Sequence, residues 1–303
     1  MHEMPNFKKV NIDDKLWVKK LLQKSNYNSC EYCFGNIFIW NEVYCHEIAD
    51  FQGFLIVKML ADNRINYYFP SGSGDLSQII RDLAMYCASN GHSLRFKNIT
   101  NDNMAVLEKL FPDSFCYTEK RNASDYIFLR EKLVTLAGKK YHSKRNHIAR
   151  FKDNSNWTYE TITDKNIDEC YEMSMNWLKE FRESENTESY KNEINAIRLA
   201  LKHFHELEFD GGLLRLNGFI AALTMGERLN CDTYVIHIEK ALHNIQGAYP
   251  FINQQFAERL PSDIKYINRE DDLGDEGLRR SKLSYYPEIL LAKYDAVLKK
   301  EGL

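Results

Sequence analysis

The order strand, glycine-containing turn, helix, strand occurs twice in this chain, and this repetition constrains its fold more than any other feature. In the first half, residues 53–60 and 65–69 are rich in β-branched and aromatic side chains, which favours strands. The turn at residues 70–74, Pro-Ser-Gly-Ser-Gly, leads into a helix predicted over residues 75–89. A strand predicted over residues 93–99 completes this first unit.

The second half repeats the same order. Residues 212–216 and 219–224 flank Asn217-Gly218, a dipeptide that suits a type I′ hairpin turn because both central residues need positive φ. A strand at residues 232–238 precedes Gly247 and Pro250, and proline is favoured in the first turn of a helix. The remaining predictions are a strand over residues 264–269 and helices over residues 11–22, 166–181 and 190–207. Since 303 residues are enough for two domains, we predict two copies of one unit.

Composition excludes several classes of protein. Forty Lys and Arg against 43 Asp and Glu give a formal charge of −3, so the molecule as a whole is not a polyanion binder. The first residues carry no signal pattern, and no apolar run approaches the roughly 18 to 20 residues that cross a bilayer, so we expect a cytoplasmic protein without a transmembrane segment. Seven scattered cysteines are typical of a reducing compartment. Cys30 and Cys33 form a single C-x-x-C, which we interpret as buried small hydrophobes, and we predict no metal site.

A basic segment at residues 138–152 concentrates charge that the rest of the chain lacks, with no acid until Asp153. Its cations are Lys139, Lys140, Lys144, Arg145, Arg150 and Lys152. As a helix it would be anchored by Tyr141, Ile148 and Phe151 and could hold phosphates; the alternative is a solvated interdomain helix. We place the domain boundary just before it, giving domains at residues 1–136 and 137–303.

The strand over residues 233–240 carries a candidate general base. Strict alternation would put Val235, His237 and Glu239 on one face, so that His237 and Glu239 are neighbours in space. Either side chain could take a proton if its pKa lies near the working pH. The alternative is a histidine that is hydrogen-bonded to a neighbouring strand.

Charges are densest over residues 266–287. Asn268 and Glu270 fall on one face of a strand, and Arg279 and Lys282 lie three apart on a predicted helix. Exposed salt bridges, which contribute little to stability, are the alternative interpretation. We predict that His237, Glu239, Asn268, Glu270 and Arg279 converge on one cleft of the second domain.

Four stretches of the chain resemble the C-terminal catalytic region of phosphatidylglycerol lysyltransferase and its soluble relatives. They are Glu31-Tyr-Cys-Phe-Gly-Asn-Ile-Phe-Ile-Trp40, Leu136-Ala-Gly-Lys-Lys-Tyr-His-Ser-Lys-Arg-Asn-His-Ile148, His237-Ile-Glu-Lys-Ala241, and Asn268-Arg-Glu-Asp-Asp-Leu-Gly274 with Gly277-Leu-Arg-Arg-Ser-Lys-Leu-Ser-Tyr-Tyr-Pro287. The resemblance implies an α/β (α+β) fold of two tandem Gcn5-related acetyltransferase-like domains, each a mixed sheet flanked by helices. Fem-type aminoacyltransferases, which use aminoacyl-tRNA, share this architecture.

The chain also departs from the pattern of its relatives. The membrane-spanning part of the lysyltransferase is absent, so a phospholipid acceptor is not implied. Coenzyme A users of this fold carry R/Q-x-x-G-x-G/A after the fourth strand, whereas His243-Asn-Ile-Gln-Gly-Ala248 keeps only the final small residue. Gly247 still leaves backbone amides near a helix start.

Our leading hypothesis is therefore an aminoacyl- or acyl-transferase that acts on an amine or hydroxyl acceptor, either a small molecule or a peptide. The donor would be aminoacyl-tRNA, or acyl-coenzyme A in the alternative of an N-acyltransferase; a non-catalytic tRNA- or ligand-binding module is a further alternative. The catalytic residues would be the five predicted to converge. Substrate binding would fall to Lys140, Lys144, Arg145, Gly247, Asp272, Lys282, Tyr285 and Tyr286.

Overall fold

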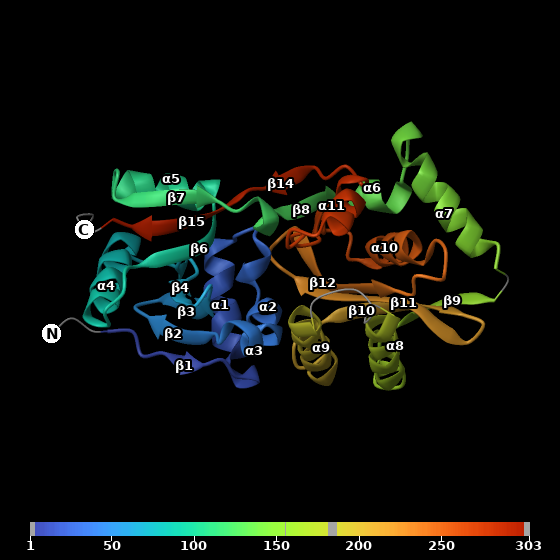
Figure 1. Ribbon diagram of the computed structural model, residues 1–303, viewed down its shortest axis with the longest axis horizontal. Coiled ribbons are helices and arrows are strands. Elements are labelled where there is room, and N and C mark those ends of the chain that lie inside the picture. Colours follow the sequence, from blue (N-terminus) through green and yellow to red (C-terminus); the bar gives the residue numbers. More distant parts are fainter. Residues whose placement is uncertain (1–3, 155, 181–186, 300–303) are drawn as a thin grey trace. The chain divides into compact units, whose positions relative to one another are not determined.

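The computed structural model of the protein describes residues 4–154, 156–180 and 187–299 (Figure 1). Within these residues the chain forms two compact units. The first holds residues up to 126 together with 271–280 and 290 onward, and the second holds residues 127–270 and 281–289. The predicted boundary at residues 136/137 therefore does not separate them, because each unit takes a segment from the other half of the chain.

The first unit is built on a mixed sheet. Its strands are β1 (Lys8–Lys9), β2 (Glu47–Phe51), β3 (Phe54–Ala61), β4 (Arg64–Tyr67), β5 (Ser71–Gly72), β6 (Arg95–Thr100), β7 (Phe115–Glu119) and β15 (Lys293–Leu298). They lie in the order β1-β2-β3-β4-β6-β15-β7, with β5 paired to β3. Neighbours are antiparallel except β4 and β6, which pair in parallel at Tyr67 and Phe96.

Helices flank this sheet. They are η1 (Ile12–Asp14), α1 (Lys15–Ser25), η2 (Cys30–Tyr32), α2 (Phe34–Ile39), α3 (Asn41–Tyr44), α4 (Leu76–Ser89), α5 (Asn101–Leu110) and η3 (Arg121–Ala123). The helix predicted after the turn at residues 70–74 is α4, and the Asp75 carboxylate caps it by accepting from the Gln78 amide at 3.0 Å. Its apolar side buries Ile79, Ile80 and Leu83, so the predicted strand, turn, helix, strand order is confirmed here.

The second unit has a matching mixed sheet. Its strands are β8 (Asp125–Leu129), β9 (Trp157–Thr161), β10 (Asp210–Leu216), β11 (Phe219–Arg228), β12 (Thr233–Ala241), β13 (Tyr266–Asn268) and β14 (Ile289–Leu291). They lie in the order β14-β8-β13-β12-β11-β10-β9, and β12 and β13 pair in parallel. The predicted hairpin turn between β10 and β11 is confirmed, because Asn217 and Gly218 both have positive φ, 51° and 88°.

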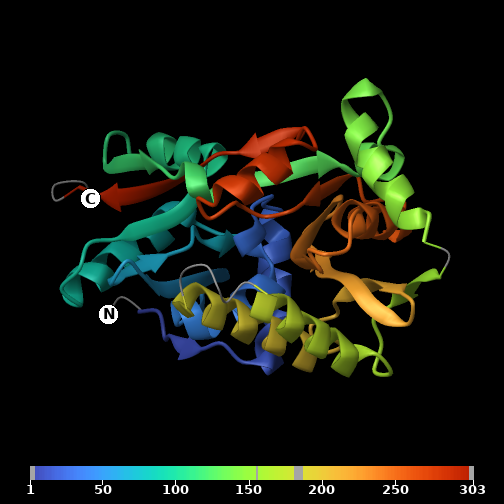
Figure 2. The same cartoon turned by 45° about the vertical axis from the view of Figure 1, so that its right-hand side comes forward.

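Helices cover both faces of this second sheet. They are α6 (Arg130–Thr135), η4 (Lys139–Tyr141), α7 (His142–Lys152), α8 (Ile167–Glu180), α9 (Thr187–Lys202) and α10 (Ala248–Arg259). The helix α11 (Glu276–Leu283) is divided between the two units, with residues 276–280 in the first and 281–283 in the second. Figures 1 and 2 show α10 on one face and the pair α8 and α9 on the other. Residue 181, the predicted end of α8, lies outside the described residues. No helix in the described ranges is long and apolar enough to cross a membrane.

The two sheets share one order of pairing, but each is completed by a strand from the other half of the chain. In the first sheet β15, the last strand, lies between β6 and β7. In the second, β8 lies at the corresponding place, beside β13. No single boundary in the sequence can separate the two sheets, because β15 pairs with β7, whose residues are more than 150 positions earlier in the chain.

A buried ionic cluster fixes the exchanged strand β15 in the first unit. The Lys293 ammonium, fully buried, donates to both oxygens of Glu31 at 2.8 Å and to Asp125 Oδ1 at 2.6 Å. Burial disfavours the charged amine, but Asp125, Cys30 and Glu31 outweigh it and hold the pKa of Lys293 well above its ordinary value. Lys293 thus ties the last strand to η2 and to the start of β8.

We expect Lys293→Met to lower the free energy of unfolding by about 3–5 kcal/mol, because it leaves two buried carboxylates without their counter-ion. Denaturant unfolding measures this loss. Lys299→Met, on an exposed lysine that donates to the Asp113 carbonyl, should lower the free energy of unfolding by less than about 0.5 kcal/mol. A loss below about 1 kcal/mol for Lys293→Met would show that the cluster does not hold the strand.

Candidate functional site

The parallel strands β12 and β13 of the second unit part after a short common stretch. Thr233, Tyr234 and Val235 pair with residues 266–268, and β12 then continues to Ala241 without a β13 partner. Backbone pairing keeps adjacent strands about 4.8 Å apart. Where the pairing ends, the strands separate, and side chains or a ligand can lie between them. The predicted catalytic residues of the second unit lie at this point of separation.

A β-bulge at His237 decides which residues face each other here. Met225 of β11 pairs with Ile238, but its neighbour Gly226 pairs with Ile236, so His237 has no partner on β11. Gly226 is required at the bulge, because a Cβ there would lie 1.9 Å from the Val235 carbonyl oxygen. The extra residue reverses the alternation of the strand beyond it.

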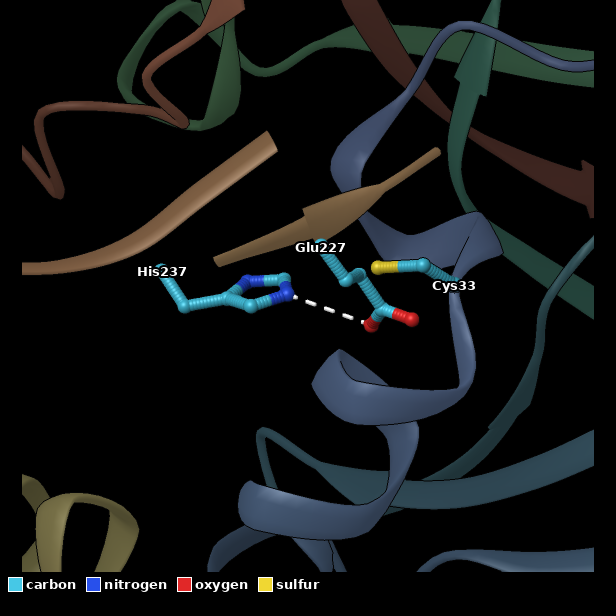
Figure 3. Close-up of side chains that lie close together, drawn as sticks. All are labelled: Cys33, Glu227 and His237. Carbon is cyan, nitrogen blue, oxygen red and sulfur yellow. Dashed lines mark hydrogen bonds and ion pairs between the residues drawn. The ribbon is translucent and has the colours of Figure 1, made fainter. Parts of the chain in front are cut away.

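His237 lies between two carboxylates. Its Nδ1 is 2.8 Å from Glu270 Oε1. Its Nε2 is 3.3 Å from Glu227 Oε1, the contact drawn in Figure 3. The imidazole is fully buried. Each ring nitrogen of an imidazole can donate or accept, and here each one faces a carboxylate oxygen. Both ring nitrogens are therefore engaged, as in the alternative interpretation of a histidine bonded to a neighbouring strand.

Asn268 supports the same cluster, because its Oδ1 accepts from the Glu270 backbone amide at 2.8 Å. Glu270 has a left-handed φ of 55°, which turns its side chain off the strand and toward His237. The structure thus brings His237, Asn268 and Glu270 together. Glu227 completes this group and was not predicted, although alternation along β11 gives it the face of its cross-strand neighbour Val235.

Glu239 lies on the opposite face of the sheet, so the prediction that it shares a face with His237 is wrong. The bulge turns Glu239 toward α10, where Asn253 Nδ2 donates to Glu239 Oε2 at 3.1 Å. Arg269 Nη2 donates to Glu239 Oε1 at 2.5 Å. The next residue, Lys240, points the other way, to Glu193 of α9 and over the Trp177 ring of α8.

This α10-side cluster contains buried polar atoms without hydrogen-bond partners in the described part of the chain. They are Arg269 Nη1, Asn253 Oδ1 and Thr224 Oγ1, and Thr224 is the direct cross-strand neighbour of Glu239. Leaving such a group unsatisfied costs roughly 1–3 kcal/mol, so atoms of this kind mark a place for a ligand or water. Sequence reasoning missed all three residues; the only available signal was Arg269 next to Asn268 in a charged strand.

The basic segment is a helix, as predicted, and it packs against α10 within the second unit. Tyr141, Ile148 and Phe151 are buried and anchor it. Lys144 lies on its inner side, with Nζ 4.0 Å from the centroid of the Tyr285 ring. Burial, and then the charge of Arg269, lower the pKa of Lys144 to about 8.

Of the other predicted binding residues of the second unit, some are exposed to solvent and others are hydrogen-bonded to backbone carbonyls. Lys140 is exposed, with Nζ 4.7 Å from the centroid of the Tyr286 ring, which is itself exposed. Arg145 Nη1 donates to the carbonyls of Leu136 and Gly138, and Lys282 Nζ donates to the Arg269 carbonyl at 2.6 Å. Arg145 and Lys282 therefore brace the backbone.

Gly247 starts α10 with φ 87°, and α7 lies directly against it. A Cβ at Gly247 would lie 2.1 Å from the His147 carbonyl oxygen of α7. The Ala248 amide is also taken, by the Ile245 carbonyl at 3.3 Å. The backbone at this helix start is thus covered, which leaves less room for a phosphate than the sequence suggested.

Arg279 and Asp272 belong to the first unit, and both are committed to one ion-pair network. The Asp272 carboxylate accepts from Arg279 Nε and Nη2 at 2.9 Å, from the Tyr126 hydroxyl at 2.5 Å and from Arg121. Arg279 also donates to Asn122 and Glu276. This is the geometry of a structural brace for the loop before α11.

One buried group in the first unit has the residue types of a metal site. Donor atoms of Cys30, Glu31 and Asp125 lie within 4.8 Å of one another. The Lys293 ammonium already contacts all three, at 3.5 Å from Cys30 Sγ and closer to the carboxylates. A cation held in this way repels a metal ion, so we assign the cluster a structural role.

The Asp272 network predicts a pH dependence. Burial alone would raise the pKa of Asp272, but hydrogen bonds from Arg279, Tyr126 and the Gly274 amide hold it well below its ordinary value. Its stabilisation is therefore full above the ordinary pKa near 3.9 and is lost as the pH falls through the lower folded value. Denaturant unfolding measures this effect. The free energy of unfolding of Asp272→Asn should lie furthest below that of the wild type at pH 7, and the difference between them should become smaller below pH 4.

Asp153→Asn, on an exposed carboxylate, serves as the control and should show no such narrowing. A deficit for Asp272→Asn that stays constant from pH 7 to pH 3 would contradict the proposed linkage.

Residues 22–297 of the chain match the family described as phosphatidylglycerol lysyltransferase, C-terminal. An uncharacterised protein of Mycoplasmoides gallisepticum is 25% identical over 186 residues, which are 57% of this chain and 56% of that protein. The chain thus aligns with just over half the length of that relative.

Solved structures show the same fold. A conserved protein of unknown function from Bacteroides thetaiotaomicron is 38% identical, with a TM-score of 0.93 over 98% of this chain and 100% of the other. L-PGS from Bacillus licheniformis is 17% identical, with a TM-score of 0.64 over 95% and 92%. FemX (9% identical, TM-score 0.60, 98% of both chains) and a tandem GNAT protein of clavulanic acid biosynthesis (7%, 0.51, 96% and 97%) share the two-unit fold. The predicted fold of two tandem Gcn5-related acetyltransferase-like domains is confirmed.

Proposed function

The chain belongs to the family of phosphatidylglycerol lysyltransferase C-terminal domains, and we propose that it transfers an activated aminoacyl or acyl group to an amine or hydroxyl acceptor. The proposal rests on one observation above all. At the separation of β12 and β13, a buried carboxylate, a guanidinium and orphaned polar atoms meet on the α10 side of the sheet. Convergent polar groups of this kind, next to buried apolar residues of α10, are typical of a small-molecule site.

Glu239 is the proposed proton acceptor. Its side chain is only 8% exposed, and Arg269 and Asn253 hold one oxygen each. Arg269 and Asn253 together fix the orientation of the carboxylate, which a general base requires. His237 is the weaker candidate, because its ring is fully buried between two carboxylates, whereas the group around Glu239 retains polar atoms without a partner among the described residues.

The proposed step exchanges one ester or thioester bond for a new amide or ester bond. The acceptor nitrogen or oxygen attacks the acyl carbonyl, and its proton passes to Glu239. The bond to the donor oxygen or sulfur then breaks, and the proton leaves with that group. The charge of Arg269 beside Glu239 also favours the negative oxygen that develops on the carbonyl.

Aminoacyl-tRNA is the donor that the geometry favours over acyl-coenzyme A. The helix start at Gly247, where this fold holds the coenzyme's phosphates in its coenzyme A users, is covered by α7. The outer side of α7 and η4 instead presents Lys139, Lys140, Arg150 and Lys152, all exposed. A cationic helix surface of this kind suits a nucleic-acid backbone.

We expect Glu239→Gln to lower the transfer rate by about 10²-fold or more, which is the usual contribution of a general base. The assay follows labelled amino acid from a pool of charged tRNA to a panel of amines, amino acids and short peptides. Glu193→Gln, which removes an equivalent carboxylate on the α9 side, should keep the wild-type rate. An unchanged rate in Glu239→Gln would refute the assignment, and tRNA binding without turnover would identify a binding module.

Alanine at Lys139, Lys140, Arg150 and Lys152 should weaken tRNA binding and flatten its salt dependence, by up to roughly 0.7–0.9 in slope for each lost phosphate contact. Filter binding at several salt concentrations measures both effects. A variant with alanine at Lys15, Lys19, Lys20 and Lys24 of α1 carries the same change in net charge and should keep the wild-type slope. If tRNA binding by the two variants has the same salt dependence, the basic segment is a solvated helix that does not contact tRNA.

A further inference from the structure

Lys144 is a partly buried cation to which the described residues offer no carboxylate, and Arg269 beside it has an amino group without an acceptor. We infer that Lys144 and Arg269 together bind one compact oxyanion, a carboxylate or a phosphate group, against the ring of Tyr285. This goes beyond the proposed function, because the anion binds whether or not a transfer step follows.

The first argument is the packing of two cations on one aromatic ring. Lys144 Nζ lies 4.0 Å from the centroid of Tyr285, and Arg269 Cζ lies 5.2 Å from it. The ring attracts each cation, but the two cations repel each other. Tyr285 is only 3% exposed, so water screens this repulsion little. The lowered pKa of Lys144, about 8, is the consequence of this burial and repulsion. An anion between the two groups removes the repulsion.

The second argument is the unused amino group of Arg269. Its Nη2 is committed to Glu239, whereas Nη1 is buried and has no acceptor in the described part of the chain. A guanidinium can donate from both amino groups to one planar oxyanion, but here only one of them has an acceptor among the described residues. An oxyanion can accept from Nη1 with one oxygen and from Lys144 with another.

The nearby carboxylate is outweighed, because Lys144 and Arg269 bring two positive charges against the one negative charge of Glu239. Both oxygens of Glu239 are already hydrogen-bonded, to Arg269 Nη2 and to Asn253 Nδ2. The orphaned Thr224 hydroxyl is a further donor on the same side of the sheet, and the orphaned Asn253 Oδ1 can accept from a hydroxyl or amine carried by the ligand. The surroundings therefore suit a small molecule that carries one anionic group and a neighbouring donor.

Lys144 differs in this respect from the exposed cations of the same helix. Lys140 lies one turn earlier, over the exposed ring of Tyr286. It can interact with any anion in solution, so it responds to ionic strength rather than to a specific ligand. Lys140 is therefore the matched control for a specific anion site at Lys144.

The test is an NMR titration of protein labelled at lysine Cε, which reports the protonation of each ammonium. Lys144→Gln assigns the signal by removing it. Inorganic phosphate and acetate are added separately at constant ionic strength, with sodium chloride as the reference. We expect the apparent pKa of Lys144 to rise by about one unit or more with at least one of the two anions, and that of Lys140 to stay unchanged.

A response to phosphate alone identifies a phosphate site, and a response to acetate alone or to both identifies a carboxylate-type oxyanion site. Arg269→Lys keeps the charge beside Glu239 but removes the second amino group, so the anion should bind at least about fivefold more weakly. No rise beyond sodium chloride with either anion, or an equal rise at Lys140, would overturn the inference. Glu239→Gln separates the two proposals, because it should lower transfer by about 10²-fold or more and keep anion binding, since the amide oxygen of Gln can still accept from Arg269 Nη2.

Discussion

The burial of one ammonium, that of Lys293, is the interaction on which this architecture depends. A lysine without counter-charges cannot remain ionised in a protein interior, so Glu31 and Asp125 must be brought to it from positions 262 and 168 residues away. Because Lys293 lies on β15 and Asp125 begins β8, the same cluster fixes both strands that are exchanged between the halves of the chain. The two sheets can then be alike in order without being continuous in sequence.

A second local constraint, the bulge at His237, sorts the polar residues of the second sheet. One extra residue on β12 separates His237, which faces Glu227 and Glu270, from Glu239, which faces Arg269 and Asn253. The first group is closed on itself, with both ring nitrogens engaged. The second retains donors and acceptors that have no partner among the described residues. This difference in hydrogen-bond satisfaction, rather than the charges alone, is the reason for which we propose chemistry at the second group.

The two sides of the basic helix α7 have different roles in the structure. Its buried side fixes it against α10, where it covers Gly247 and brings Lys144 to the ring of Tyr285. Its outer side keeps four cations exposed. One amphipathic helix thus packs against the start of α10 with its inner side and keeps a cluster of exposed cations on its outer side.

The sequence by itself determined the repeated unit, the type I′ turn at Asn217-Gly218 and the helix with Tyr141, Ile148 and Phe151 inside, because these follow from local periodicity and φ preferences. Only the tertiary structure decided the exchange of β8 and β15, since long-range pairing leaves no local pattern. It also decided the faces of β12: strict alternation placed Glu239 beside His237, and a bulge, which depends on the partner strand, moved it away. Arg269, Asn253 and Thr224 came together for the same reason, through contacts between strands and a helix that no spacing along the chain encodes.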